Sequence, residues 1–115
     1  SKVKMVDRIE PDNTNVIEAG PGEAVEARAF GPGLAKGPFD FEWSIDGKKV
    51  KGFAKLDKNT GIVTYRVHVP TDEIPAESKI LKLTLKDPTK HVKKDPQGLL
   101  NHEISWALKI TKAEN

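Results

Sequence analysis

The chain has 115 residues, which is enough for one domain with one hydrophobic core and no more. Its 19 basic and 17 acidic side chains leave a net charge of only +2, which argues against a dedicated nucleic-acid binder. There is no cysteine, so disulfides, thiolate metal sites and cysteine nucleophiles are excluded, and no apolar run is long enough for membrane insertion.

The dominant pattern is a period-two alternation of apolar and polar residues, typical of half-buried β-strands. Weak alternation near the N-terminus is followed by stronger stripes, and no stretch of ten residues shows a helical period. In chain order, the apolar positions are Val3, Met5 and Ile9; Val25, Ala27 and Ala29; Phe39, Phe41, Trp43 and Ile45; Val63, Tyr65, Val67 and Val69; Leu81, Leu83 and Leu85; Ile104, Trp106, Leu108 and Ile110. The chain is therefore predicted to be all-β.

Turn signals lie between these stripes rather than within them. Asp46 and Gly47 predict a two-residue hairpin with a type I′ turn, and the segment 57–61 predicts a second reversal. The resulting seven to eight antiparallel strands favour a β-sandwich that occupies residues 1–115 as one domain, with 111–115 as a frayed tail or linker. The expected core is Val25, Ala27, Phe41, Trp43, Ile45, Tyr65, Val67, Leu81, Leu83, Ile104, Trp106 and Leu108.

Three segments resemble immunoglobulin-like domains. Residues 39–47 (FDFEWSIDG) resemble the third strand of such domains, in which a tryptophan packs across the two sheets, and residues 22–29 (GEAVEARA) resemble the second strand. Residues 56–67 (LDKNTGIVTYRV) are similar to the Asp-x-x-Thr-Gly turn and strand of cadherin-like and bacterial immunoglobulin-like repeats, and 31–34 (GPGL) are similar to a filamin segment. The resemblance implies a cysteine-free immunoglobulin-like β-sandwich.

Catalytic and metal-binding patterns are weak. His68 lies on the polar side of its stripe, which predicts an exposed histidine, and neither a zinc-protease helix motif nor a nucleophile elbow is present. Oxygen ligands for calcium could come from loop residues, and cadherin-like modules bind calcium with such residues. The candidate pairs are Asp12 with Asn13, Asp57 with Asn59, and Asp72 with Glu73. No pair has enough ligands, so we expect no catalytic site, metal or cofactor.

Charge is distributed unevenly along the chain. Residues 10–26 carry five acidic side chains and no basic one, whereas residues 79–94 carry six lysines and one acid. The 15-residue segment 87–101 is also long for a connection between two strands. It either connects two strands as a solvated loop with lysines that protect an edge, or recognises an anionic partner. The candidate ligand-binding residues are Lys86, Lys90, His91, Lys93 and Lys94.

Three functions therefore remain open. The first is a non-catalytic structural or adhesion module of a larger extracellular or cell-envelope protein, monomeric when isolated. The second is a binding module for an acidic or sulfated glycan through the basic segment 86–102, and the third is a virion or other assembly component in which acidic and basic regions of successive copies meet. Sugar stacking on several exposed rings is not expected, since only Phe30 and Phe53 lie off the core stripes.

Overall fold

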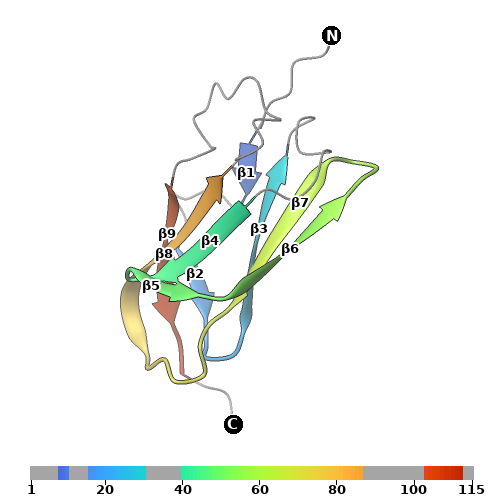
Figure 1. The fold of residues 1–115 in the computed structure, drawn as a ribbon. Coiled ribbons are helices and arrows are strands. Elements are labelled where there is room, and N and C mark those ends of the chain that lie inside the picture. The colour runs from blue at the N-terminus through green and yellow to red at the C-terminus, as the bar shows by residue number, and fades with distance from the viewer. Residues whose placement is uncertain (1–7, 11–15, 31–39, 87–102, 113–115) are drawn as a thin grey trace.

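The computed structural model describes residues 8–10, 16–30, 40–86 and 103–112, and these form nine β-strands (Figure 1). The strands are β1 (Arg8–Glu10), β2 (Ile17–Ala19), β3 (Ala24–Phe30), β4 (Asp40–Ile45), β5 (Lys48–Val50), β6 (Gly52–Asp57), β7 (Ile62–His68), β8 (Ala76–Lys86) and β9 (Glu103–Ile110). The described residues contain no helix long and apolar enough to cross a membrane.

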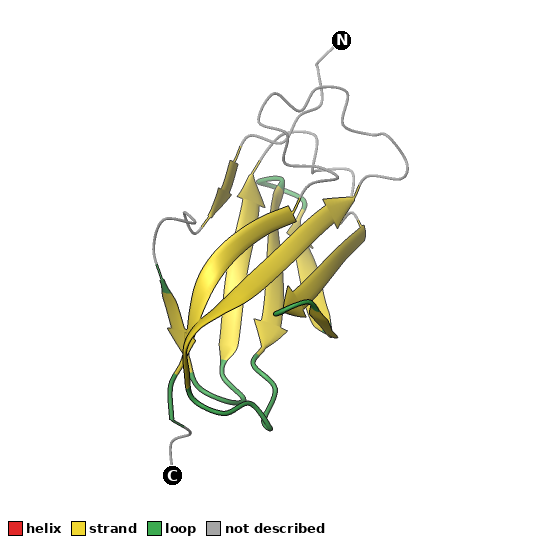
Figure 2. Cartoon of the chain, turned by 90° about the vertical axis from the view of Figure 1, so that its left-hand side faces the viewer, coloured by secondary structure: helices red, strands yellow, loops and turns green. Residues whose placement is uncertain are grey.

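The strands form two sheets that pack face to face (Figure 2). One sheet has the order β1-β3-β7-β6 and the other β2-β9-β8-β4-β5. In immunoglobulin nomenclature this is an A-B-E-D sheet opposite a G-F-C-C′ sheet, with the second part of the split first strand beside G. The topology confirms the predicted immunoglobulin-like β-sandwich.

The strand count and one pairing differ from the prediction of seven to eight antiparallel strands. The described residues form nine strands, and β2 pairs with β9 in parallel. The strands that the apolar stripes did not predict include β2, which is only three residues long. Three residues are too few to produce a recognisable alternation, and the direction of pairing depends on which sheet the segment joins.

The predicted turns form as expected. Asp46 and Gly47 have φ angles of 48° and 82°, the two positive values that a type I′ turn requires. The Asp46 carboxylate accepts a hydrogen bond from the Ile80 amide at 2.7 Å, which fastens the hairpin to β8. At the second reversal the Asp57 carboxylate accepts hydrogen bonds from the amides of Asn59 and Thr60, and Gly61 adopts φ 75°.

The core lies between the sheets and matches the predicted list. Ten of the twelve predicted residues are buried, and Phe41 and Ile104 are half-buried against the same cluster. The Trp43 and Trp106 rings, from β4 and β9, lie 6.1 Å apart, and Phe41 meets Tyr65 edge to face at 5.2 Å. In antibody domains the corresponding tryptophan packs on a disulfide. In this chain the aromatic and aliphatic side chains of the core surround it instead.

Tyr65 is fully buried, and its hydroxyl has no hydrogen-bond partner among the described residues. An unpaired buried hydroxyl contributes a desolvation penalty to the folded state. We therefore expect Tyr65→Phe to leave the free energy of unfolding unchanged or to raise it by up to about 1 kcal/mol, as measured by urea denaturation. A loss above about 1 kcal/mol would show that the hydroxyl makes a stabilising interaction.

Burial also raises the pKa of Tyr65 above its ordinary value near 10. Above pH 10 the unfolded chain releases this proton while the folded chain retains it, so the unfolded state is favoured. As pH rises above 10, the free energy of unfolding of the unmodified protein should therefore fall by up to about 1.4 kcal/mol per pH unit more than that of the Tyr65→Phe variant, which lacks this proton. Below pH 10 the two proteins should show the same pH dependence. Since Tyr65 is the only tyrosine, phenolate absorbance reports its ionisation directly. Phenolate formation at pH 10 in the folded protein would contradict the prediction.

Candidate functional site

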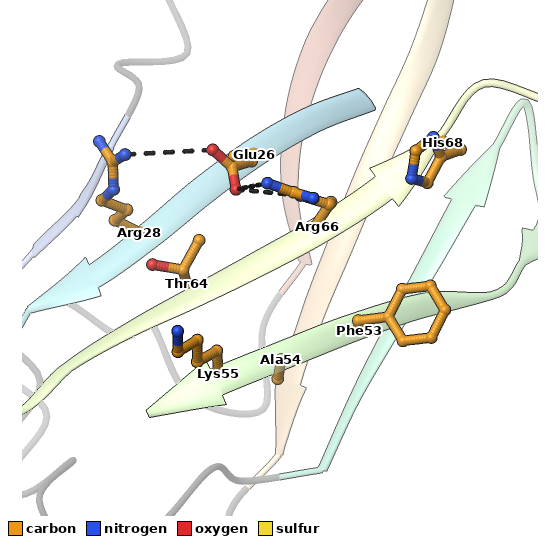
Figure 3. Close-up of a pocket in the computed structure, with 8 residues that line it drawn as sticks. All are labelled: Glu26, Arg28, Phe53, Ala54, Lys55, Thr64, Arg66 and His68. Atoms are coloured by element: carbon orange, nitrogen blue, oxygen red, sulfur yellow. Dashed lines mark hydrogen bonds and ion pairs between the residues drawn. The ribbon is translucent and has the colours of Figure 1, made fainter. Parts of the chain in front are cut away.

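A groove crosses the outer face of the four-stranded sheet (Figure 3). Alternation along β3, β6 and β7 directs apolar side chains into the core and leaves the intervening residues on this face. The groove has a volume of about 490 Å³, which is within the range of small-ligand sites. It is lined by Glu26, Arg28, Phe53, Ala54, Lys55, Thr64, Arg66 and His68.

The strand register arranges the outward-facing side chains in rows across the sheet. Arg28 on β3 and Lys55 on β6 both lie opposite Thr64 on β7, so the short threonine separates two long cationic side chains. In the next row, Arg66 lies between Glu26 and Phe53. Phe53 is 57% exposed, whereas Trp43, Tyr65 and Trp106 are buried in the core.

Positive charge exceeds negative charge in the groove. Arg66 donates to one carboxylate oxygen of Glu26 through Nε at 3.1 Å and Nη2 at 2.9 Å. Arg28 reaches the other oxygen of Glu26 only at 4.0 Å. Lys55 has no ion-pair partner among the described residues. The residues that line the groove thus include three cationic side chains and one carboxylate, which leaves positive charge available to a ligand.

His68 closes one end of the groove and is exposed, as its place in the sequence predicted. Its Nδ1 lies 3.1 Å from the carbonyl oxygen of Gly22. With the proton on Nδ1, this nitrogen donates to the carbonyl and leaves Nε2 as an acceptor. Thr64, the hydroxyl residue of the groove, is four residues away along β7, or about 13 Å in an extended strand. The two therefore do not form a nucleophile and base pair.

The outer face of the five-stranded sheet has a different arrangement of charge. Three of its lysines are paired with carboxylates on neighbouring strands: Lys49 with Glu42 at 3.4 Å, Lys82 with Glu103 at 3.2 Å, and Lys109 with Glu18 at 3.8 Å. Exposed pairs such as these contribute about 0–1 kcal/mol each, but they neutralise the surface locally. Among the described residues, the two faces therefore differ in pairing: these three lysines each have a carboxylate partner, whereas Lys55 on the four-stranded sheet has none.

The predicted ligand-binding residues lie mainly outside the part of the chain that the structure describes. Lys90, His91, Lys93 and Lys94 belong to residues 87–102, and of Lys86 the structure gives only its backbone position opposite Asp40. The basic segment therefore remains a prediction, as does any role for it in ligand binding.

The folded chain partly neutralises the acidic and basic segments of the sequence. Glu18 and Glu26, from the acidic segment, pair with Lys109 and Arg66. Lys79 and Lys82, from the basic segment, pair with Glu73 at 3.0 Å and with Glu103. Charge that is segregated along the sequence is therefore partly balanced across strands.

Two of the three candidate calcium pairs have other roles in the described residues. The Asp57 carboxylate stabilises its own turn, and Glu73 is paired with Lys79. The third pair, Asp12 and Asn13, lies outside the described residues. In the described ranges, no three histidine or acidic side chains cluster closely enough to hold a metal ion.

Sequence reasoning identified some members of the groove without identifying the groove itself. Alternation placed Thr64, Arg66 and His68 on a solvated face and left Phe53 as a candidate for exposure. It could not show that Arg28 and Lys55 flank Thr64, because that neighbourhood depends on the register among three strands. The signal that could have revealed it is the presence of cationic residues on the polar side of three strands.

Comparisons with known proteins found no matching family model and no matching curated protein. Similar folds occur among solved structures. The titin M3 domain is 12% identical, with a TM-score of 0.45, and the likeness covers 95% of this chain and 91% of that one. The titin M4 domain is 12% identical, with a TM-score of 0.48 and coverage of 96% and 100%. A chain in a complex of titin M10 with an obscurin-like 1 immunoglobulin domain is 8% identical, with a TM-score of 0.44, and the likeness covers 99% of this chain and 93% of that one.

Proposed function

We propose that the chain is a non-catalytic spacer or adhesion module of a larger protein, outside the cell or in the cell envelope. The observation that supports this proposal is the path of the backbone. β1 lies beside the C-terminal end of β3, whereas β9 ends beside β2 at the opposite end of the sandwich (Figure 1). A module with its entry and exit at opposite ends extends a chain of domains by its own length.

The same path determines how tension between the two ends would load the sheets. β2 and β9 run in parallel, with Ile17 opposite Leu108 and Ala19 opposite Ile110. Tension would draw β2 toward the entry end and β9 toward the exit end, so their hydrogen bonds would be sheared together rather than opened one at a time. One of these bonds joins the Thr111 amide to the Ala19 carbonyl at 3.1 Å.

Within this proposal, the turn at Asp57 supports assignment to the cadherin-like or bacterial branch of immunoglobulin-like domains. The Asp57 carboxylate accepts hydrogen bonds from the amides of Asn59 and Thr60, as is typical of an Asp residue at the start of such a turn. The GPGL segment, which resembles filamin repeats, lies outside the described residues. An alternative in which an anionic glycan binds the basic segment 86–102 is tested by the same probes as the groove below.

Single-molecule pulling from the two ends tests the spacer role. We expect Ile17→Pro, which weakens the β2–β9 pairing, to lower the unfolding force more than its loss of chemical stability would explain. Val25→Ala in β3 is the control, because it truncates a buried side chain away from the β2–β9 pair. If variants matched for stability in urea unfold at equal force, β2–β9 shear does not resist tension, and this spacer role is contradicted.

A further inference from the structure

We propose that the groove on the four-stranded sheet binds an acidic saccharide. The site is distinct from the basic segment 86–102 and independent of the spacer role. Its anion-binding element is the row of Arg28, Thr64 and Lys55, in which two cationic side chains flank a hydroxyl (Figure 3). A sulfate or carboxylate above Thr64 would accept hydrogen bonds from all three side chains.

Positive charge is available to a ligand because the cationic side chains that line the groove outnumber its carboxylates. Glu26 is committed to Arg66 through two hydrogen bonds and reaches Arg28 only at 4.0 Å. Lys55 has no ion-pair partner among the described residues, in contrast to Lys49, Lys82 and Lys109 on the other sheet. An anion entering the groove therefore needs to displace no existing ion pair at Lys55.

The rest of the groove favours a sugar over a purely charged ligand. Phe53 lies one row from Lys55 on the same strand, about 7 Å along it, so a ligand bound at Lys55 can extend over the ring. Its 57% exposed ring offers an apolar surface to the C–H face of a sugar. The Glu26 carboxylate accepts hydroxyl donors but repels additional acidic groups. These features favour a ligand with few charges and many hydroxyls rather than an acidic peptide or a nucleic acid.

The test is an amide NMR titration of the full chain with a sulfated disaccharide at low and moderate salt. We expect saturable shifts confined to β3, β6 and β7 that weaken as salt rises. The neutral, desulfated disaccharide and inorganic sulfate should each bind more weakly, because each supplies only part of the ligand. Lys55→Ala should weaken binding by about three- to tenfold, and Phe53→Ala should also weaken it.

Lys49→Ala is the matched control, since Lys49 is an exposed strand lysine on the opposite sheet. It should leave the affinity unchanged. Lys55 is a better test than Arg28 because Arg28 lies opposite Glu10 in the register of β1 and β3. The spectra of all variants report directly whether each one is folded.

Several outcomes would overturn the proposal. Shifts confined to residues 86–102 would place anion binding in the basic segment instead. Equal affinity for an acidic hexapeptide would remove the preference for a saccharide, and equal loss of affinity in Lys49→Ala would indicate non-specific attraction. An absence of saturable shifts at millimolar concentrations would exclude the site. None of these outcomes would affect the spacer role, which is tested by force.

Discussion

Replacement of Trp43 by alanine is expected to lower the free energy of unfolding by about 3–5 kcal/mol. Trp43 is only 1% exposed and lies between the sheets, with its ring 6.1 Å from that of Trp106. Truncation removes the largest class of side chain from a core that cannot close completely over the space. Because a typical domain has a total stability of 5–15 kcal/mol, this loss is a large part of the whole.

Urea denaturation measures this loss. The measurement is made at low temperature so that a weakly stable variant stays folded over a wider range of urea concentrations, which defines the folded baseline. Phe53→Ala is the control for removal of an aromatic ring, because Phe53 is mostly exposed. It should change the stability by about 0.5 kcal/mol or less. A loss below about 1 kcal/mol for Trp43→Ala would mean that the tryptophan does not support the core.

The layers and the core were predictable because period-two alternation encodes burial directly. A strand such as β7 presents Val63, Tyr65 and Val67 to one side and Thr64, Arg66 and His68 to the other, whatever its neighbours are. The turns were predictable for a related reason. The positive φ angles at Asp46 and Gly47 are readily adopted by few residue types.

The groove was not predictable because it depends on which strands become neighbours. Arg28 and Lys55 are 27 positions apart and meet Thr64 only after β3 and β6 have both paired with β7 in one register. The charge segregation along the sequence was a poor guide for the same reason. Glu18 and Lys109 are distant in the chain, yet they pair because β2 joins β9.

Gly52 illustrates a constraint that the sequence pattern did not indicate. The chain passes from β5 in one sheet to β6 in the other through the single residue Lys51, and Gly52 begins the second sheet. A Cβ atom at Gly52 would lie 2.7 Å from the Arg66 carbonyl oxygen and 2.8 Å from Nε1 of Trp43, and it would overlap Cδ1 of that ring. The indole therefore occupies space that any other residue at position 52 would need.

Gly52→Ala is accordingly expected to lower the free energy of unfolding by about 1–3 kcal/mol or more, because the tryptophan ring or the β6–β7 pairing must shift. Gly47→Ala is the matched control. It meets nothing within 4 Å, so its cost, about 1 kcal/mol, arises only from the positive φ of 82°.

A double-mutant cycle separates the two causes. Trp43→Phe removes Nε1 and leaves a smaller ring with room to shift away from position 52, so it should reduce the cost of Gly52→Ala by at least about 0.5 kcal/mol and leave the cost of Gly47→Ala unchanged. Urea denaturation of the single and double variants measures both coupling energies. Additive losses at Gly52 and Trp43 would show that the indole does not set the requirement for glycine. A loss in the double variant that is smaller than the sum of the two single losses would show that the tryptophan between the sheets also determines how the chain crosses from one sheet to the other.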